Sequence, residues 1–190
     1  MSSHPRFKWI NVPNAITSAR ILLVPVFIWL LLVNPDKHDL TRWWVVAIFV
    51  LAMSTDGLDG AIARRKGLIT NLGKILDPIA DKALIGGGLV ILSYLGELNW
   101  WATALILVRE LGITVYRLIV VKKRVIAASS GGKVKTVLQS VMLGLLLSPF
   151  DYYLPWLVGV ELVLVWATVA VTLYTGGQYV VAAAKASTKG

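Results

Sequence analysis

Cysteine is absent from this chain, and charged residues are scarce, since only 15% of the residues are Asp, Glu, Lys or Arg. The lack of cysteine excludes disulfide bonds and zinc sites with cysteine ligands. A typical soluble domain is about 25% charged and roughly 45–50% apolar, whereas 57% of these residues are hydrophobic. The composition therefore indicates a membrane protein rather than a soluble domain.

Long apolar runs recur along the chain, and about 17–25 such residues suffice to cross roughly 30 Å of hydrocarbon. We expect an all-α integral membrane protein with six transmembrane helices, forming one membrane domain over residues 1–190. Residues 1–14 are polar or mixed and are expected to lie in the cytoplasm or at the interface, ahead of a first span that is retained rather than cleaved. A glycine pair, Gly176–Gly177, is expected to bend or end the last span. The expected spans are Ala15–Val33, Trp43–Ala63, Gly73–Leu95, Trp100–Val121, Lys135–Leu147 and Pro155–Ala184.

Basic residues gather between alternate spans. Of the nineteen Lys and Arg, thirteen lie on one predicted side of the membrane, and only Lys37 and Arg42 lie on the other. The positive-inside rule therefore predicts that both termini are cytoplasmic. The same face would attract anionic lipid headgroups, so the basic charge requires no nucleic-acid partner. An aromatic belt is expected at the opposite face from Trp43, Trp44, Trp100, Trp101 and Trp156.

Four of the ten acidic residues fall between positions 56 and 81. Asp56 and Asp59 are three apart near the end of the second span, and Asp77 and Asp81 are four apart near the start of the third, so each pair shares a helix face. At about 1.5 Å per residue, Asp59 and Asp77 lie roughly 6–8 Å from the cytoplasmic ends. Asp56 and Asp81 lie deeper, at roughly 12 Å. If the two helices face each other, all four carboxylates converge.

Four carboxylates in a region of low dielectric would repel one another and lose hydration. Divalent cations resolve this conflict, because hard oxygen ligands suit Mg²⁺, Mn²⁺ or Ca²⁺. A pair of such ions can clamp the attacking and leaving oxygens of a phosphoryl displacement. The alternative is that the aspartates neutralise nearby cations or line a water-filled vestibule. We favour the metal site, because ionisable residues inside a membrane usually have a function.

Small residues accompany the aspartates. Gly60 and Ala63 lie on the same helix, and Gly73 could begin the next one. They would let a ligand approach the backbone closely, although small residues serve helix packing in membranes equally well. Arg64 could contact a phosphate or anchor the helix end.

The spacing Asp56-x-x-Asp59-Gly60-x-x-Ala63-Arg64, followed by Gly73, Asp77 and Asp81, resembles the signature of the CDP-alcohol phosphotransferase family. The resemblance implies that family's fold and a reaction in which an alcohol hydroxyl attacks the β-phosphate of a CDP-linked substrate and releases CMP. It also implies two divalent ions, Mg²⁺ or Mn²⁺, held by the four aspartates, with Asp81 as the base. It further implies a homodimer and a cytidine diphosphate pocket lined by Gly60, Ala63, Arg64 and Gly73.

Further segments resemble the phosphatidylglycerophosphate synthase branch of the family, which implies CDP-diacylglycerol and sn-glycerol 3-phosphate as substrates. These segments are residues 11–20, 77–82, 109–110 and 131–136. A phosphorylated acceptor needs cations, and Arg109 and Arg117 share a helix face while Lys133 and Lys135 begin the next helix on the same side. We predict that these four residues bind the acceptor phosphate. The alternative is that Arg109 pairs with Glu110 or another acid and that the lysines are membrane anchors.

Three other functions stay open. A CDP-type cardiolipin synthase shares the 77–82 ending but takes phosphatidylglycerol as its acceptor. A phosphatidylinositol phosphate synthase tends to lack Pro78 and Lys82. A divalent-cation transporter would need acidic residues that continue toward the opposite face, and the second and third spans have none beyond Asp56 and Asp81. For the preferred function we expect a multi-pass protein of the inner, cytoplasmic membrane with its active site facing the cytoplasm.

Overall fold

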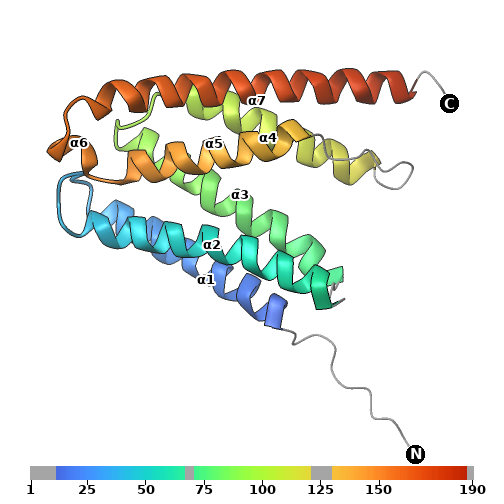
Figure 1. Ribbon diagram of the computed structural model, residues 1–190, viewed down its shortest axis with the longest axis horizontal. Coiled ribbons are helices and arrows are strands. Elements are labelled where there is room, and N and C mark those ends of the chain that lie inside the picture. Colours follow the sequence, from blue (N-terminus) through green and yellow to red (C-terminus); the bar gives the residue numbers. More distant parts are fainter. Residues whose placement is uncertain (1–11, 67–70, 121–129, 188–190) are drawn as a thin grey trace, which may run out of the picture. The chain divides into compact units, whose positions relative to one another are not determined.

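The structure is a computed structural model that describes residues 12–66, 71–120 and 130–187, with side chains described for residues 17–55, 76, 78–116 and 134–184. Within these ranges every regular element is an α-helix (Figure 1). The helices are α1 Val12–Val33, α2 Arg42–Lys66, α3 Asn71–Tyr94, α4 Trp100–Val120, α5 Ser130–Leu147, α6 Phe150–Tyr153 and α7 Leu157–Ser187.

The long helices occupy the positions of the six predicted spans, so the all-α fold is confirmed for the residues that the structure describes. Three details differ from the sequence-based expectation. Helix α5 begins at Ser130 rather than Lys135, and the short helix α6 was not predicted. The glycine pair at 176–177 does not end α7, which continues to Ser187. A glycine weakens a helix interior by about 1 kcal/mol, which is too little to end a long helix that packs against its neighbours.

One helical segment within the described residues, Leu157–Ala184 of α7, is long and apolar enough to cross a membrane by length and composition. Three shorter apolar segments are Thr17–Val33, Arg42–Thr55 and Val134–Leu147. Six transmembrane helices and cytoplasmic termini therefore stay a prediction.

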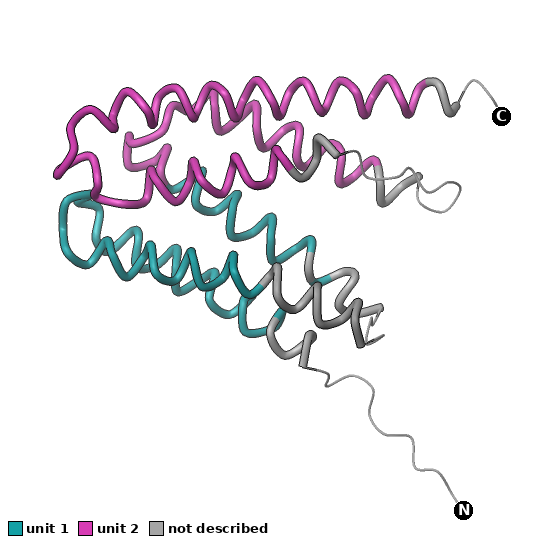
Figure 2. The backbone as a smooth tube through the Cα atoms, viewed as in Figure 1, with its two compact units in different colours: residues 1–91 teal, residues 92–190 magenta. Residues whose placement is uncertain are grey.

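The chain divides into two compact units, residues 1–91 and residues 92–190 (Figure 2). The sequence predicted a single membrane domain over residues 1–190, and this stays a prediction. In the first unit α1 packs against α2. Their buried residues recur every three or four positions, which is the spacing of one helix face. These residues are Val24, Phe27 and Leu31 of α1 and Val45, Phe49 and Ala52 of α2.

The connection between α1 and α2 is held by polar side chains. The Asp39 carboxylate accepts hydrogen bonds from the backbone N–H and the hydroxyl of Thr41, at 2.8 and 3.0 Å, just before α2 begins. Arg42, at the first position of α2, is fully buried, and its Nη1 donates to the carbonyl of Asn34 at 3.4 Å. Asp is common in such turns because its side chain can bond the backbone two residues further on. These contacts set the tight reversal between the two helices.

Helix α3 approaches α1 closely at one glycine. A methyl group at Gly87 would lie 3.0 Å from Cδ1 of Ile28, which is shorter than an ordinary carbon–carbon contact of about 3.5–4.0 Å. Ala80 and Leu84 of the same helix are almost fully buried. The absence of a side chain at Gly87 lets α3 approach α1 within the first unit.

In the second unit α7 packs against both α4 and α5. The turn from α3 into α4 uses Gly96, whose φ of 80° is a conformation that favours glycine. Asn99 then caps α4 by accepting a hydrogen bond from the N–H of Trp101 at 2.8 Å. Ala102, Ile106 and Leu147 are fully buried near this end. Buried polar residues lie here too, Thr103, Ser148 and Glu161 among them, and others follow further along the same three helices.

Candidate active site

The four aspartates of the motif lie at matched positions on two consecutive helices. Asp56 stands ten residues before Lys66, where α2 ends, and Asp81 stands ten residues after Asn71, where α3 begins. Asp59 and Asp77 are correspondingly seven and six residues from those ends. At about 1.5 Å per residue, the deeper pair lies about 15 Å along its helices and the shallower pair about 10 Å.

A link of only four residues, 67–70, joins the two helix ends. Such a link separates them by at most about 18 Å, and short links usually connect antiparallel neighbours. The matched positions therefore agree with a convergence of the four carboxylates. The side chains of Asp56, Asp59 and Asp77 lie outside the described residues, so this convergence stays a prediction.

Asp81 is the member of the motif whose side chain is described. Its carboxylate is 26% exposed, and its Oδ2 lies 3.8 Å from Nζ of Lys82, which is 27% exposed. It follows directly after Ala80, which is fully buried. A partly exposed carboxylate on a packed helix can contact a ligand without any movement of the helix.

The predicted metal ligands are carboxylates throughout. Hard oxygen donors of this kind suit Mg²⁺ or Mn²⁺, so the donor set fits the expected ions. Among the side chains that the structure describes, no three acidic or histidine residues are grouped closely enough to hold a metal. The predicted cytidine diphosphate residues Gly60, Ala63 and Arg64 lie in α2 and Gly73 in α3, but their surroundings fall outside the described side chains.

A second group of charges lies in the second unit and joins three helices. Nη1 of Arg109, on α4, donates to Oε1 of the adjacent Glu110 at 2.7 Å. Nζ of Lys135, on α5, donates to the same oxygen at 2.5 Å. Nη2 of Arg109 donates to the hydroxyl of Thr175, on α7, at 2.9 Å. We call Arg109, Glu110, Lys135 and Thr175 the cationic cluster, because its three charges sum to +1.

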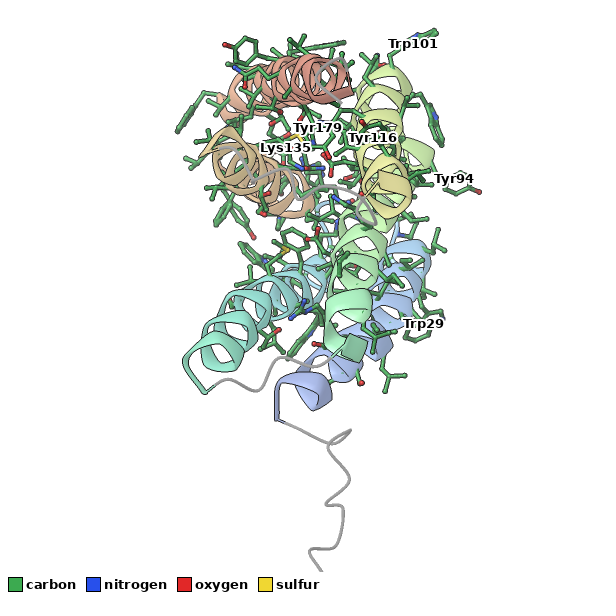
Figure 3. All side chains as sticks on the ribbon, turned by 90° about the vertical axis from the view of Figure 1, so that its right-hand side faces the viewer. Trp29, Tyr94, Trp101, Tyr116, Lys135 and Tyr179 are labelled. Carbon is green, nitrogen blue, oxygen red and sulfur yellow. The ribbon has the colours of Figure 1, made fainter. Side chains whose placement is uncertain are left out.

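The cationic cluster is withdrawn from solvent. The side chains of Glu110 and Lys135 are 5% and 7% exposed, and that of Arg109 is 15% exposed. Removing charges from water is costly unless they are paired and hydrogen-bonded, and the shared carboxylate meets that need. Figure 3 shows Lys135 between the helices of this unit, together with Tyr116 of α4 and Tyr179 of α7, whose rings pack edge to face at 5.9 Å.

Two of the four basic residues predicted to bind the acceptor phosphate, Arg109 and Lys135, are thus brought together at one carboxylate. The pairing of Arg109 with Glu110, which was the alternative suggested by the sequence, is also present. Arg117 lies in α4 and Lys133 in α5, but their side chains lie outside the described residues. The phosphate-binding role of all four stays a prediction.

Next to the cluster lie buried polar groups that the sequence did not single out. Gln139 follows Lys135 by one turn of α5, and Thr172 precedes Thr175 by one turn of α7; both are almost fully buried. Nε2 of Gln139, Oγ1 of Thr172 and Nε of Arg109 have no hydrogen-bond partner in this structure. Sequence reasoning missed Glu110, Thr175 and this layer as parts of a site, because no local spacing relates three separate helices.

Comparison with known proteins bears on both groups of residues. Residues 10–174 match the sequence profile of the CDP-alcohol phosphatidyltransferase family. The probable phosphatidylglycerophosphate synthase of Mycobacterium tuberculosis strain H37Rv is 45% identical over 170 residues, which cover 90% of this chain and 80% of the relative. The CDP-diacylglycerol–glycerol-3-phosphate 3-phosphatidyltransferase of Bacillus subtilis is 34% identical over 180 residues, covering 89% and 93%.

A third relative is similar over a shorter stretch. The cardiolipin synthase (CMP-forming) of Streptomyces coelicolor is 37% identical over 101 residues, which cover 53% of this chain and 47% of the relative. The family profile, in contrast, spans the aspartate motif and the three charged residues of the cationic cluster, and it ends one residue before Thr175. This chain belongs to the CDP-alcohol phosphatidyltransferase family.

Proposed function

We propose that this protein is a phosphatidyltransferase of phospholipid biosynthesis that moves the phosphatidyl group of CDP-diacylglycerol to sn-glycerol 3-phosphate, giving phosphatidylglycerophosphate and CMP. The observation that carries this proposal is similarity across nearly the whole chain. The relatives from M. tuberculosis and B. subtilis cover 90% and 89% of it, and their names specify this reaction or its product.

The reaction forms one bond and breaks one. The acceptor's hydroxyl oxygen bonds to the β-phosphorus of CDP-diacylglycerol, and the bond from that phosphorus to the bridging oxygen breaks, so that CMP leaves with the electron pair. The hydroxyl proton passes to a base, for which we propose the Asp81 carboxylate, 26% exposed and therefore open to a ligand. A carboxylate within hydrogen-bond reach can accept such a proton as the nucleophile attacks.

For the donor side we propose that Asp56, Asp59, Asp77 and Asp81 hold two divalent cations, Mg²⁺ or Mn²⁺. When bound, such ions neutralise a diphosphate and stabilise the charge of the leaving CMP. The chain contributes four carboxylates at matched helix positions. We propose that Gly60, Ala63, Arg64 and Gly73 border the cytidine diphosphate, because small residues let a ligand approach the helix backbone.

For the acceptor side we propose that Arg109, Arg117, Lys133 and Lys135 bind the phosphate of glycerol 3-phosphate. Support comes from the cationic cluster, where Arg109 and Lys135 meet at the Glu110 carboxylate. A guanidinium can bind a phosphate through two parallel N–H bonds, and an ammonium adds a point charge. A dianionic phosphate is therefore a ligand that two adjacent cations would recognise.

The proposed setting is the inner, cytoplasmic membrane. We propose six transmembrane helices, both termini in the cytoplasm, an active site facing the cytoplasm and assembly as a homodimer. Support comes from the six long helices and from the thirteen basic residues on one predicted side. This arrangement would keep the acyl chains of the donor in lipid while a soluble acceptor enters from the cytosol.

The test is CMP release by the purified protein with CDP-diacylglycerol and Mg²⁺. Glycerol 3-phosphate, inositol 1-phosphate and phosphatidylglycerol are offered separately, and we expect release with glycerol 3-phosphate alone. Release only with phosphatidylglycerol would favour the second candidate, a CMP-forming cardiolipin synthase, which the relative from S. coelicolor supports over half of this chain. Release only with inositol 1-phosphate would indicate a phosphatidylinositol phosphate synthase and would contradict the proposed acceptor.

A further inference from the structure

We propose that Gly176 of α7 is a positioning residue for the acceptor site. Because glycine has no side chain, it leaves a space in which Arg109 lies beside Glu110, and we call this space the seat. The inference rests on the proposed function, in which Arg109 and Lys135 bind the acceptor phosphate. It assigns the last helix a part in substrate recognition, although the sequence of that helix shows no family motif.

The three atoms nearest to a side chain at Gly176 all belong to one residue, Arg109. A methyl group at position 176 would lie 2.9 Å from Cγ, 3.2 Å from Nε and 3.7 Å from Cδ of Arg109. Ordinary contacts between carbon atoms are about 3.5–4.0 Å, so any residue larger than glycine would collide with the arginine. All three nearest atoms belong to Arg109, and none belongs to the backbone of α4.

The collision would involve the part of the Arg109 side chain close to its backbone, at Cγ. Cγ and Cδ carry the guanidinium, so a displacement there moves every nitrogen beyond them. Those nitrogens make the bonds of 2.7 Å to Glu110 and 2.9 Å to Thr175. The Thr175 hydroxyl is in turn fixed by donating to the carbonyl of Val171 at 2.8 Å. Glycine at 176 therefore lets the guanidinium lie between one fixed hydroxyl and one fixed carboxylate.

Glu110 carries this placement to the second cation. Its Oε1 accepts hydrogen bonds from both Arg109 and Lys135, so the two positive groups stand next to each other in spite of their mutual repulsion. Two parallel bonds to a phosphate require donors in a fixed arrangement, and a small misplacement of a binding group can lower activity strongly. Gly176 and Glu110 thus set the positions of Arg109 and Lys135 without needing to contact the acceptor.

The simpler explanation is that Gly176 only allows α7 to pack against α4, since small residues commonly serve helix contacts in membranes. Two observations favour the specific role. The nearest atoms are those of one arginine side chain rather than a helix surface. The two helices also meet independently through Tyr116 and Tyr179.

The neighbouring Gly177 supplies a matched control. It is exposed, and a methyl group there would have nothing within 4 Å. Both substitutions to alanine replace glycine inside the same helix and raise its helix propensity by about 1 kcal/mol. Gly176 is buried and Gly177 exposed, and only the methyl group at 176 would collide with Arg109, so a difference between the two variants reports on that contact.

The experiment measures CMP release by the full chain with CDP-diacylglycerol and Mg²⁺, varying each substrate in turn. We expect Gly176→Ala to raise the KM for glycerol 3-phosphate about tenfold, or about 1.4 kcal/mol, with the KM for CDP-diacylglycerol unchanged within about twofold. Gly177→Ala should leave both values at those of the natural chain. Equilibrium binding of labelled glycerol 3-phosphate to metal-free protein should weaken by the same factor in Gly176→Ala alone.

Equal effects of the two alanine variants, or equal changes in both KM values, would overturn the inference. If Gly176→Ala does not yield folded protein by gel filtration, the same substitution is made in an Arg109→Ala background, where the side chain that it would meet is absent. Folded protein with the KM of Arg109→Ala alone is then expected; a further rise in the KM for glycerol 3-phosphate, or failure of the double variant to fold, would overturn the inference. If the natural chain uses another acceptor, the proposed function fails, and an unchanged KM of Gly176→Ala for that acceptor would refute the role of Gly176 as well.

Discussion

The aspartate motif and the cationic cluster are built in opposite ways. The four aspartates lie on two consecutive helices within 26 residues of sequence, at spacings of three and four. The cationic cluster draws on α4, α5 and α7, and its hydrogen bonds join residues 25 and 66 positions apart. The comparison shows that the residues of a family's shared chemistry can be recognised from their spacing in the sequence. The proposed recognition of the acceptor, in contrast, depends on tertiary contacts.

The two groups also differ in how their charges are balanced. The cationic cluster contains its own carboxylate, Glu110, buried against both cations. The aspartates would gather four negative charges, which repel one another unless cations join them. Removing divalent metal ions should therefore abolish the catalytic role proposed for the aspartates and leave acceptor binding at the cationic cluster intact. Substitutions in each group and metal removal can test this contrast.

The largest expected effect is the loss of any aspartate of the motif. Asp56→Asn, Asp59→Asn, Asp77→Asn and Asp81→Asn should each lower kcat at least about 10³-fold, or about 4 kcal/mol, because an amide cannot supply the negative charge of a ligand or base. Asp36→Asn is the control, since its side chain is 73% exposed in the loop between α1 and α2. CMP release is the measurement, and near-normal activity in one variant would remove that residue from the site.

Metal removal should have a comparable effect that is reversible. Excess EDTA should stop CMP release, and Mg²⁺ or Mn²⁺ should restore it, because hard divalent ions suit carboxylate ligands. Binding of labelled glycerol 3-phosphate should persist in EDTA, since the cationic cluster keeps a net charge of +1 without any metal ion. Turnover that continues in excess chelator would contradict the metal site. Loss of acceptor binding together with turnover would contradict the separation of the two groups.

A smaller and more selective effect is expected in the cationic cluster. Arg109→Ala and Lys135→Ala should raise the KM for glycerol 3-phosphate roughly 10–100-fold, about 1.4–2.7 kcal/mol, with a smaller effect on the KM for CDP-diacylglycerol. Each variant also removes one buried partner of Glu110, which is destabilising, so thermal unfolding is followed in parallel. Lys37→Ala, in the loop between α1 and α2, is the control. Equal effects on both substrates would argue against an acceptor-phosphate role.

Much of the fold could be predicted from the sequence because apolar runs and turn residues are local signals. All six long helices fall where the runs lie. The early start of α5 was missed because Ser130 begins a Ser-Gly-Gly stretch, which usually indicates a loop. Helix α6 was missed because four residues are too few to show helical periodicity.

The candidate site could be predicted only in part, for a related reason. The aspartates are recognisable because their spacing lies within two helices. The sequence predicted that Arg109 and Lys135 bind the same phosphate and therefore lie close together. It indicated Glu110, the carboxylate that joins them, only as an alternative partner of Arg109. Gly176 could not be foreseen, because its contribution is the absence of a side chain opposite a residue 67 positions earlier.

The contact between Arg109 and α7 has a consequence for how the protein is made. Arg109 and Glu110 are neighbours in the chain, so the arginine has a counter-charge as soon as α4 is synthesised. Thr175 and Gly176 lie in the last helix and are synthesised 66 and 67 residues after Arg109. A nascent chain can therefore carry the complete aspartate motif while its arginine still lacks a seat. In the proposed assignment, the ability to recognise the acceptor would be completed last, when α7 joins the helices made before it.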